Sequence, residues 1–107
     1  MKLITAVVLP HALDDVRRAL ERHAVLGMTV TEISDAAPGQ VEVHKGVSRR
    51  LELVPRLRIE TVVHDELVDR VVDQILVNLS GTEGRLTVVP VDTVLRVRTG
   101  ERGADAV

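Results

Sequence analysis

The sequence contains no cysteine and no phenylalanine, tyrosine or tryptophan. Without cysteine, disulfide bonds, thiolate chemistry and cysteine-based metal sites are excluded. Without aromatic side chains, a surface that binds single-stranded nucleic acid by stacking on the bases is excluded as well. The core must therefore be aliphatic, and valine alone accounts for 21 of the 107 residues.

The sequence also lacks a large excess of charge of one sign and a long hydrophobic run. The formal net charge is -2 at pH 7, and no run of lysine and arginine is long enough for the basic field that DNA binding needs. No apolar stretch approaches the roughly 20 residues of a membrane span, and the first residues do not have the pattern of a signal peptide. The composition predicts one soluble, cytoplasmic domain over residues 1–107, with no nucleic-acid partner and no membrane insertion.

Hydrophobic periodicity predicts two strand–helix–strand units. The first comprises a strand at 2–9, a helix at 11–24 closed by Gly27, and a strand at 28–33. The second comprises a strand at 51–63, a helix at 65–79 and short strands at 86–89 and 94–98. Residues 34–48 are predicted as a loop, with a strand extension at 41–43 left open. Asp65 is predicted to cap the second helix, and Asp14 and Asp15 to complement the dipole of the first.

This order of elements predicts an α+β fold, the ferredoxin-like βαββαβ sandwich, with both helices on one face of the sheet. The other face is also apolar, and nothing else in so short a chain can cover it. The pattern therefore predicts oligomerisation.

Two arginines stand two residues apart in the predicted strand 94–98. On a strand, Arg96 and Arg98 would project from the same face, where their guanidinium groups suit phosphates or carboxylates. A solvated strand face is the alternative explanation for such a pair. A second element favours an anion site, because the turn from Gly81 to Gly84 is followed by Arg85.

Other candidate clusters have simpler explanations. The four histidines lack the spacing of metal ligands; they are His11, His23, His44 and His64. The acidic pairs 14–15 and 65–66 stand at predicted helix starts, where capping explains them better than acid–base catalysis. We expect no metal site and no catalytic site.

Several stretches spread over almost the whole chain resemble the P-II signal-transduction family. They are residues 1–6, 13–17, 27–32, 55–60, 67–69 and 97–101, with Gly103 following. The resemblance implies a homotrimer with its sheets facing the central axis, which binds ATP or ADP, with or without Mg²⁺, in clefts between subunits. It implies a regulatory protein rather than an enzyme, whose loop docks on a partner such as a membrane transporter or an enzyme of nitrogen or carbon metabolism.

The resemblance also implies roles for individual residues. Arg96 and Arg98 match a pair that reaches the phosphates from the neighbouring subunit, and Gly84 and Arg85 match the turn at 80–85 that cradles them. Arg56 stands where the family has a lysine that contacts an oxo-acid carboxylate. The positions that line the nucleoside part of the cleft are Val7, Thr29, Glu60 and Val62. The regulatory loop spans 34–50, with partner-binding residues Val43, His44, Lys45, Gly46 and Arg49, and residues 99–107 form a C-terminal tail.

The chain departs from the family pattern in two places. The turn Thr82-Glu83-Gly84-Arg85 has lost one of the family's glycines, and the large loop is shorter and contains no tyrosine, which excludes tyrosine nucleotidylation. The family's glutamine that binds magnesium and 2-oxoglutarate has no secure counterpart, although Gln40 is near in sequence, so 2-oxoglutarate is disfavoured. The alternative is a P-II-like scaffold that has lost ATP and 2-oxoglutarate binding and senses another adenylyl nucleotide or a small anion.

Overall fold

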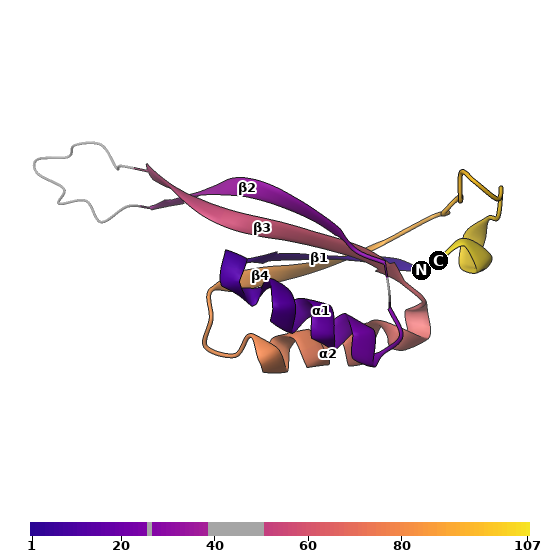
Figure 1. Cartoon of the computed structure of the whole chain (residues 1–107), viewed down its shortest axis with the longest axis horizontal. Helices are drawn as coiled ribbons and strands as arrows, with labels where there is room; N and C mark the ends of the chain where they lie inside the picture. The colour runs from indigo at the N-terminus through magenta and orange to yellow at the C-terminus, as the bar shows by residue number, and fades with distance from the viewer. Residues whose placement is uncertain (26, 39–50) are drawn as a thin grey trace, which may run out of the picture.

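The computed structural model describes residues 1–25, 27–38 and 51–107 as a four-stranded antiparallel sheet with two helices on one face (Figure 1). The strands are β1 (Lys2–Val8), β2 (Thr29–Pro38), β3 (Leu51–Val63) and β4 (Gly84–Pro90), in the order β2-β3-β1-β4. The helices are α1 (Leu13–Arg22) and α2 (Val68–Asn78), with short 3-10 turns before each and at Gly103–Ala106. The predicted ferredoxin-like α+β fold is confirmed.

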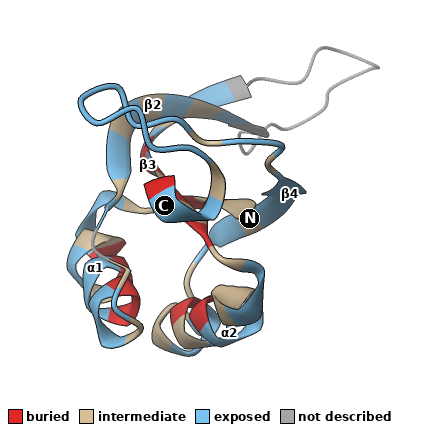
Figure 2. Ribbon diagram, turned by 90° about the vertical axis from the view of Figure 1, so that its right-hand side faces the viewer, coloured by how far each residue is buried: buried red, intermediate tan, exposed pale blue. Residues whose placement is uncertain are grey.

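The core lies between the helices and the sheet, where Figure 2 shows the buried residues gathered. Because side chains alternate along a strand, β1 and β3 each give one row to this layer. The members of the core are all aliphatic: Ile4, Ala6 and Val8 from β1, Leu57, Ile59 and Val63 from β3, and Ala12, Val16, Ala19, Leu20, Val71 and Ile75 from the helical side. The predicted aliphatic core is confirmed.

Strand β3 has the predicted ends, but β2 is longer than predicted. Residues 34–38, predicted as loop, continue β2 and pair in register with β3, from Ser34 opposite Pro55 to Pro38 opposite Leu51. Strand β1 ends at Val8, opposite Leu57. Beyond that point, residues 33–38 and 51–56 therefore form a two-stranded ribbon that extends past the sheet (Figure 1). Strand β4 begins at Gly84, two residues earlier than predicted.

The predicted strand at 94–98 is wrong. Only an isolated bridge joins Leu95 to Arg102, and residues 97–99 form a turn. The backbone N–H of Arg96 donates to the carbonyl of Glu101 at 2.9 Å, and that of Gly100 donates back to Arg96 at 2.8 Å. Gly100 has φ +75°, a left-handed conformation that glycine adopts without steric cost, so the chain reverses here. Arg96 and Arg98 do not share one face of a sheet strand.

Two predicted helix boundaries are also wrong. Asp65 is not the N-cap of α2, which is Leu67, but lies in the 3-10 turn before that helix. Its carboxylate accepts from the N-terminal amine of Met1 at 2.8 Å. Gly27 does not close α1, which ends at Arg22. The chain leaves α1 through Ala24 at φ +59°, while Val25 N–H donates to the Leu20 carbonyl at 3.0 Å. This is a Schellman ending with alanine at the left-handed position. Asp14 and Asp15 lie in the first turn of α1, as predicted.

Within the residues that the structure describes, neither helix has the length and the apolar composition needed to cross a membrane.

The alanine at the left-handed position gives a direct test of the α1 ending. Ala24→Gly should stabilise the protein by about 0.5–1 kcal/mol, because glycine adopts a positive φ without the clash of a Cβ atom. Thermal unfolding at matched protein concentration should show a melting temperature higher by a few degrees. Ala24→Val is the matched control and should lower it. A lower melting temperature for Ala24→Gly would contradict this ending of the helix.

Candidate functional site

The face of the sheet that carries no helix brings together most of the sequence-predicted nucleotide residues. Strand register places Val7 opposite both Arg58 and Arg85, and Glu60 opposite both Thr5 and Thr29. In antiparallel sheets, residues directly opposite each other project to the same face. Val7, Thr29, Glu60, Val62 and Arg85 therefore all belong to this face, as the predicted alternation along residues 51–63 requires.

One end of this face holds a cavity of about 350 Å³ at the predicted phosphate-binding turn. Four elements build it: β1, the ribbon strands β2 and β3, and the turn that leads into β4. Its lining residues are Val7, Asp35, Arg56, Thr82, Glu83, Gly84 and Arg85. Four of the predicted ligand contacts, Val7, Arg56, Gly84 and Arg85, thus lie in one place.

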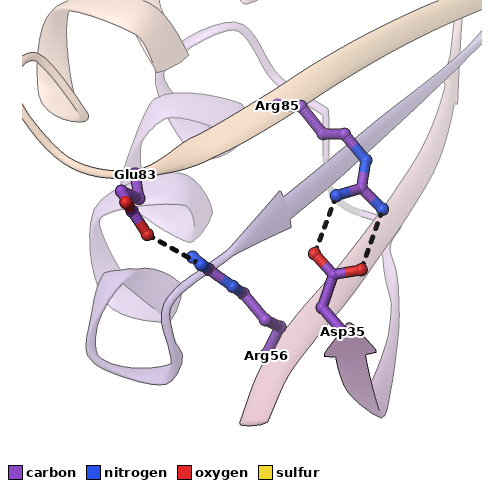
Figure 3. A network of polar contacts seen from close by, with 4 residues as sticks. All are labelled: Asp35, Arg56, Glu83 and Arg85. Atoms are coloured by element: carbon purple, nitrogen blue, oxygen red, sulfur yellow. Dashed lines mark hydrogen bonds and ion pairs between the residues drawn. The ribbon is translucent and has the colours of Figure 1, made fainter. Parts of the chain in front are cut away.

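Arg56 is the most unusual side chain of this cavity because it is only 8% exposed. Its Nη2 donates to Oε2 of Glu83 at 2.9 Å (Figure 3). Within the described part of the chain, its buried Nε and Nη1 have no hydrogen-bond partner. Buried donors on a charged group are costly when they lack acceptors. An anion in the cavity would supply those acceptors.

Arg85 is more exposed and is held by Asp35. Its Nη1 donates to Oδ2 of Asp35 at 2.8 Å and its Nη2 donates to Oδ1 at 3.4 Å (Figure 3). The hydrogen bond from Arg85 lowers the pKa of the Asp35 carboxyl below its ordinary 3.8 and, reciprocally, raises the pKa of Arg85. Both arginines of the cavity therefore already face a carboxylate.

Sequence reasoning missed Asp35 and Glu83 as site residues. Asp35 lies in residues predicted as loop, and its contact with Arg85 joins positions 50 residues apart. Glu83 is visible in the turn sequence, but its pairing with Arg56 depends on how the ribbon folds against that turn. The sequence does offer one signal that could have found them: an acidic residue stands beside each segment that is predicted to bind an anion.

Gly84 has a structural role in addition to the predicted phosphate contact. It lies opposite Val8 in the β1–β4 ladder, and a Cβ atom there would stand 2.8 Å from the backbone carbonyl oxygen of Val7. The absence of a side chain is what allows β4 to begin so close to β1.

The predicted nucleoside contacts gather in a second hollow, of about 480 Å³, further along the same face. It is lined by Leu3, Gly27, Met28, Thr29, Glu60, Thr61 and Val62. Thr29, Glu60 and Val62 thus lie together, whereas Val7 belongs to the first cavity. Leu3 and Val7 are four positions apart along β1, which is about 13 Å in an extended strand.

Arg96 and Arg98 lie beyond the other end of the sheet. Arg85 is opposite Val7, but β4 ends at Pro90 opposite Lys2, and the chain then leads away from the ribbon (Figure 1). Arg96 donates from Nε to the carbonyl of Ala106 at 3.1 Å, and Arg98 is exposed in the turn. The five residue steps from Arg85 to Pro90 already span about 16 Å along β4. One chain therefore does not bring these arginines to Arg85.

The remaining predictions concern residues that the structure leaves undescribed or scattered. Val43, His44, Lys45, Gly46 and Arg49 lie outside the described residues. In the ranges 1–25, 27–38 and 51–107, no three histidine or acidic side chains gather where a metal ion could bind.

Gly84→Ala tests the close approach of β4 to β1. The added Cβ would press against backbone, which cannot rotate away, so we expect a loss of about 1–3 kcal/mol. Gly27→Ala is the matched control, because an added Cβ there meets nothing within 4 Å. Chemical unfolding should show a clear loss for the first variant and about 0.5 kcal/mol or less for the second. Equal losses would refute the assigned contact.

Asp35→Asn tests the ion pair with Arg85 through its pH dependence. Because the folded pKa of Asp35 lies below 3.8, the ionised carboxylate contributes stability in full above 3.8 and loses it as the pH falls through the folded pKa. The variant should melt slightly below the wild type at pH 5–7, and the difference should shrink as the pH falls below 3.8. Melting curves at these pH values measure it. A difference that persists or grows in acid would contradict the pairing.

Comparison of the sequence with known proteins points to one family. Residues 1–101 match the family model for nitrogen regulatory protein P-II. The chain is 38% identical to the nitrogen regulatory protein P-II of Nostoc punctiforme and 37% identical to that of Azospirillum brasilense, with both chains covered completely in each case. It is 40% identical to nitrogen regulatory protein P-II 2 of Methanothermobacter thermautotrophicus, covering 97% of that protein. The chain belongs to the P-II family of nitrogen regulatory proteins.

Proposed function

We propose that this P-II protein is a cytoplasmic homotrimeric regulator that binds an adenine nucleotide, ATP or ADP, in clefts between its subunits. The nucleotide state controls a partner protein of nitrogen or carbon metabolism, through the ribbon and the segment 39–50 that joins its two strands in the sequence. The names of the relatives describe regulatory proteins, and this supports a role in signalling rather than catalysis.

The observation that carries the proposal is the cavity around Arg56. The guanidinium of Arg56 has two buried nitrogens without a partner in the described part of the chain, and it lies beside Arg85 and the close backbone at Gly84. Arginine forks bind phosphate oxygens with two parallel hydrogen bonds, so the cavity suits the phosphates of a ligand. The second hollow, on the same face, suits the nucleoside.

The trimer follows from what a single chain leaves incomplete. The helix-free face carries apolar Leu3, Val62 and Val89 in one row, and Val89 is 45% exposed. Arg96 and Arg98 lie too far from Arg85 to reach the same ligand. A neighbouring subunit would cover the first feature and supply the second. Arg98 is the more available of the two arginines, because it is exposed whereas Arg96 is hydrogen-bonded to its own tail.

A second candidate function is favoured by the carboxylates in the cavity. Because Asp35 and Glu83 already face the two arginines, a triphosphate meets two negative charges at its binding site. A P-II scaffold with this arrangement would suit an adenylyl nucleotide with fewer charges, or a small anion.

Isothermal titration calorimetry with ATP, ADP, AMP, cyclic AMP and 2-oxoglutarate tests both candidates. We expect at least one adenine nucleotide to bind at up to three sites per trimer and 2-oxoglutarate to leave no signal. The trimer is measured separately by light scattering. If none of the nucleotides binds, the proposed nucleotide-sensor function is wrong. Chromatography of the recovered ligand should show no turnover; conversion of bound nucleotide would instead indicate an enzyme.

Arg98→Ala tests the contribution of the neighbouring subunit. Loss of a charge-assisted hydrogen bond to phosphate should weaken the bound nucleotide by about ten-fold or more while the trimer stays intact. Adding Arg96→Ala should weaken it further, although that change also removes the bond to the Ala106 carbonyl. Arg70→Ala, on the exposed surface of α2, is the matched control. Unchanged affinity in Arg98→Ala would show that this arginine makes no phosphate contact.

A further inference from the structure

Two ion pairs join the ribbon to the turn at the start of β4 (Figure 3). In one pair the ribbon supplies the acid, and in the other it supplies the base. From the ribbon, β2 supplies the acid Asp35 and β3 supplies the base Arg56. From the turn side, Glu83 faces Arg56 and Arg85 faces Asp35, each with an N–O distance at or below 2.9 Å. The same two arginines that suit a bound anion therefore also hold the ribbon.

The ribbon needs such support because it extends past the sheet. Residues 33–38 and 51–56 pair only with each other there, since β1 ends opposite Leu57. A two-stranded hairpin without further packing is marginally stable in water. The two ion pairs are cross-links between this ribbon and the rigid four-stranded body.

The Asp35 pair is accessible enough to exchange its partner. The side chain of Arg85 is 58% exposed and that of Asp35 is 28% exposed. Exposed ion pairs of this kind are weak, because water and salt compete with them. A phosphate oxygen in the cavity offers Arg85 the same two-point geometry as the carboxylate, at higher charge.

We propose that Asp35 is an internal competitor of the ligand: a phosphate group takes Arg85 by displacing the Asp35 carboxylate, and this displacement frees the ribbon from the turn. The inference rests on the proposed nucleotide function and adds a specificity-determining residue to it. Glu83 plays the same part at Arg56, with less freedom because Arg56 is buried. Occupancy of the cavity is thereby converted into a looser attachment of the ribbon that carries residues 39–50.

The charge of Asp35 also sets which ligands the cavity accepts. After displacement, the carboxylate remains beside the phosphates and repels them in proportion to their charge. Its removal should therefore favour ATP more than ADP, and ADP more than AMP.

The test compares Asp35→Asn with Glu32→Gln. Both variants remove one negative charge from β2, but Glu32 is opposite Leu57 on the other face of the strand and makes no ion pair with either arginine in the described structure. Calorimetry should show AMP binding about two-fold tighter in Asp35→Asn, and ATP about five-fold tighter or more. Glu32→Gln should change either affinity by less than about 1.5-fold.

Amide hydrogen exchange measures the release of the ribbon. Amides at 33–36, 52–54 and 56 should exchange faster when ATP is added to the wild type, and equally fast in ligand-free Asp35→Asn. Arg85→Gln should show the same fast exchange without ATP and should bind ATP weakly. This pattern separates competition from a general loss of structure, because the exchange of α2 should stay constant throughout.

The outcomes distinguish this inference from the function on which it rests. If ATP binds the wild type and Asp35→Asn equally well, and ribbon exchange does not respond to ligand, the competitor role is overturned and the nucleotide function stands. If only Asp35→Asn binds ATP, the competitor role is supported and ATP is not the ligand of the wild type. If neither protein binds nucleotides or pyrophosphate, both proposals fail.

Discussion

Strand β1 is hydrogen-bonded to a neighbour on each side, and the rest of the structure depends on this double pairing. Its alternation gives Ile4, Ala6 and Val8 to the aliphatic core and leaves Val7 on the helix-free face. The register with β3 and β4 then places Val7 opposite both Arg58 and Arg85. Gly84 allows β4 to begin against the carbonyl of Val7, so the turn that we propose to bind phosphate is positioned by the same strand that organises the core.

The alternation of apolar and polar residues predicts those parts of the structure that depend on neighbours in the sequence. The alternation over 51–63 predicts β3 with its observed ends, because a strand with one buried face must alternate. Residues 94–98 alternate equally well, but in the described structure they make only an isolated bridge, and Gly100 turns the chain back. Ala24 occupies the left-handed position where glycine is expected, and for this reason the predicted end of α1 is too late. The Asp35–Arg85 pair joins residues 50 apart, and its existence depends on the length of β2.

The candidate site combines a costly buried charge with carboxylates that offset it. Arg56 is buried with two nitrogens that find no partner among the described residues, an arrangement that folding alone does not favour. Glu83 and Asp35 reduce the local excess of positive charge in the free protein, and a bound phosphate would do so in the complex. The same side chains tie the ribbon to the body, so the proposed ligand would act on the ribbon through shared contacts rather than through a distant relay.

The central claim is that one site needs the Arg85 turn of one subunit and the Arg98 turn of its neighbour. Mixed trimers test it most directly: Arg85→Gln and Arg98→Ala chains, each defective alone, are unfolded together, refolded at equal amounts and titrated with nucleotide. Random assembly should restore about a quarter of the sites, those that combine the intact Arg85 of one chain with the intact Arg98 of the other. Recovery of no sites in trimers shown to be mixed would contradict the account.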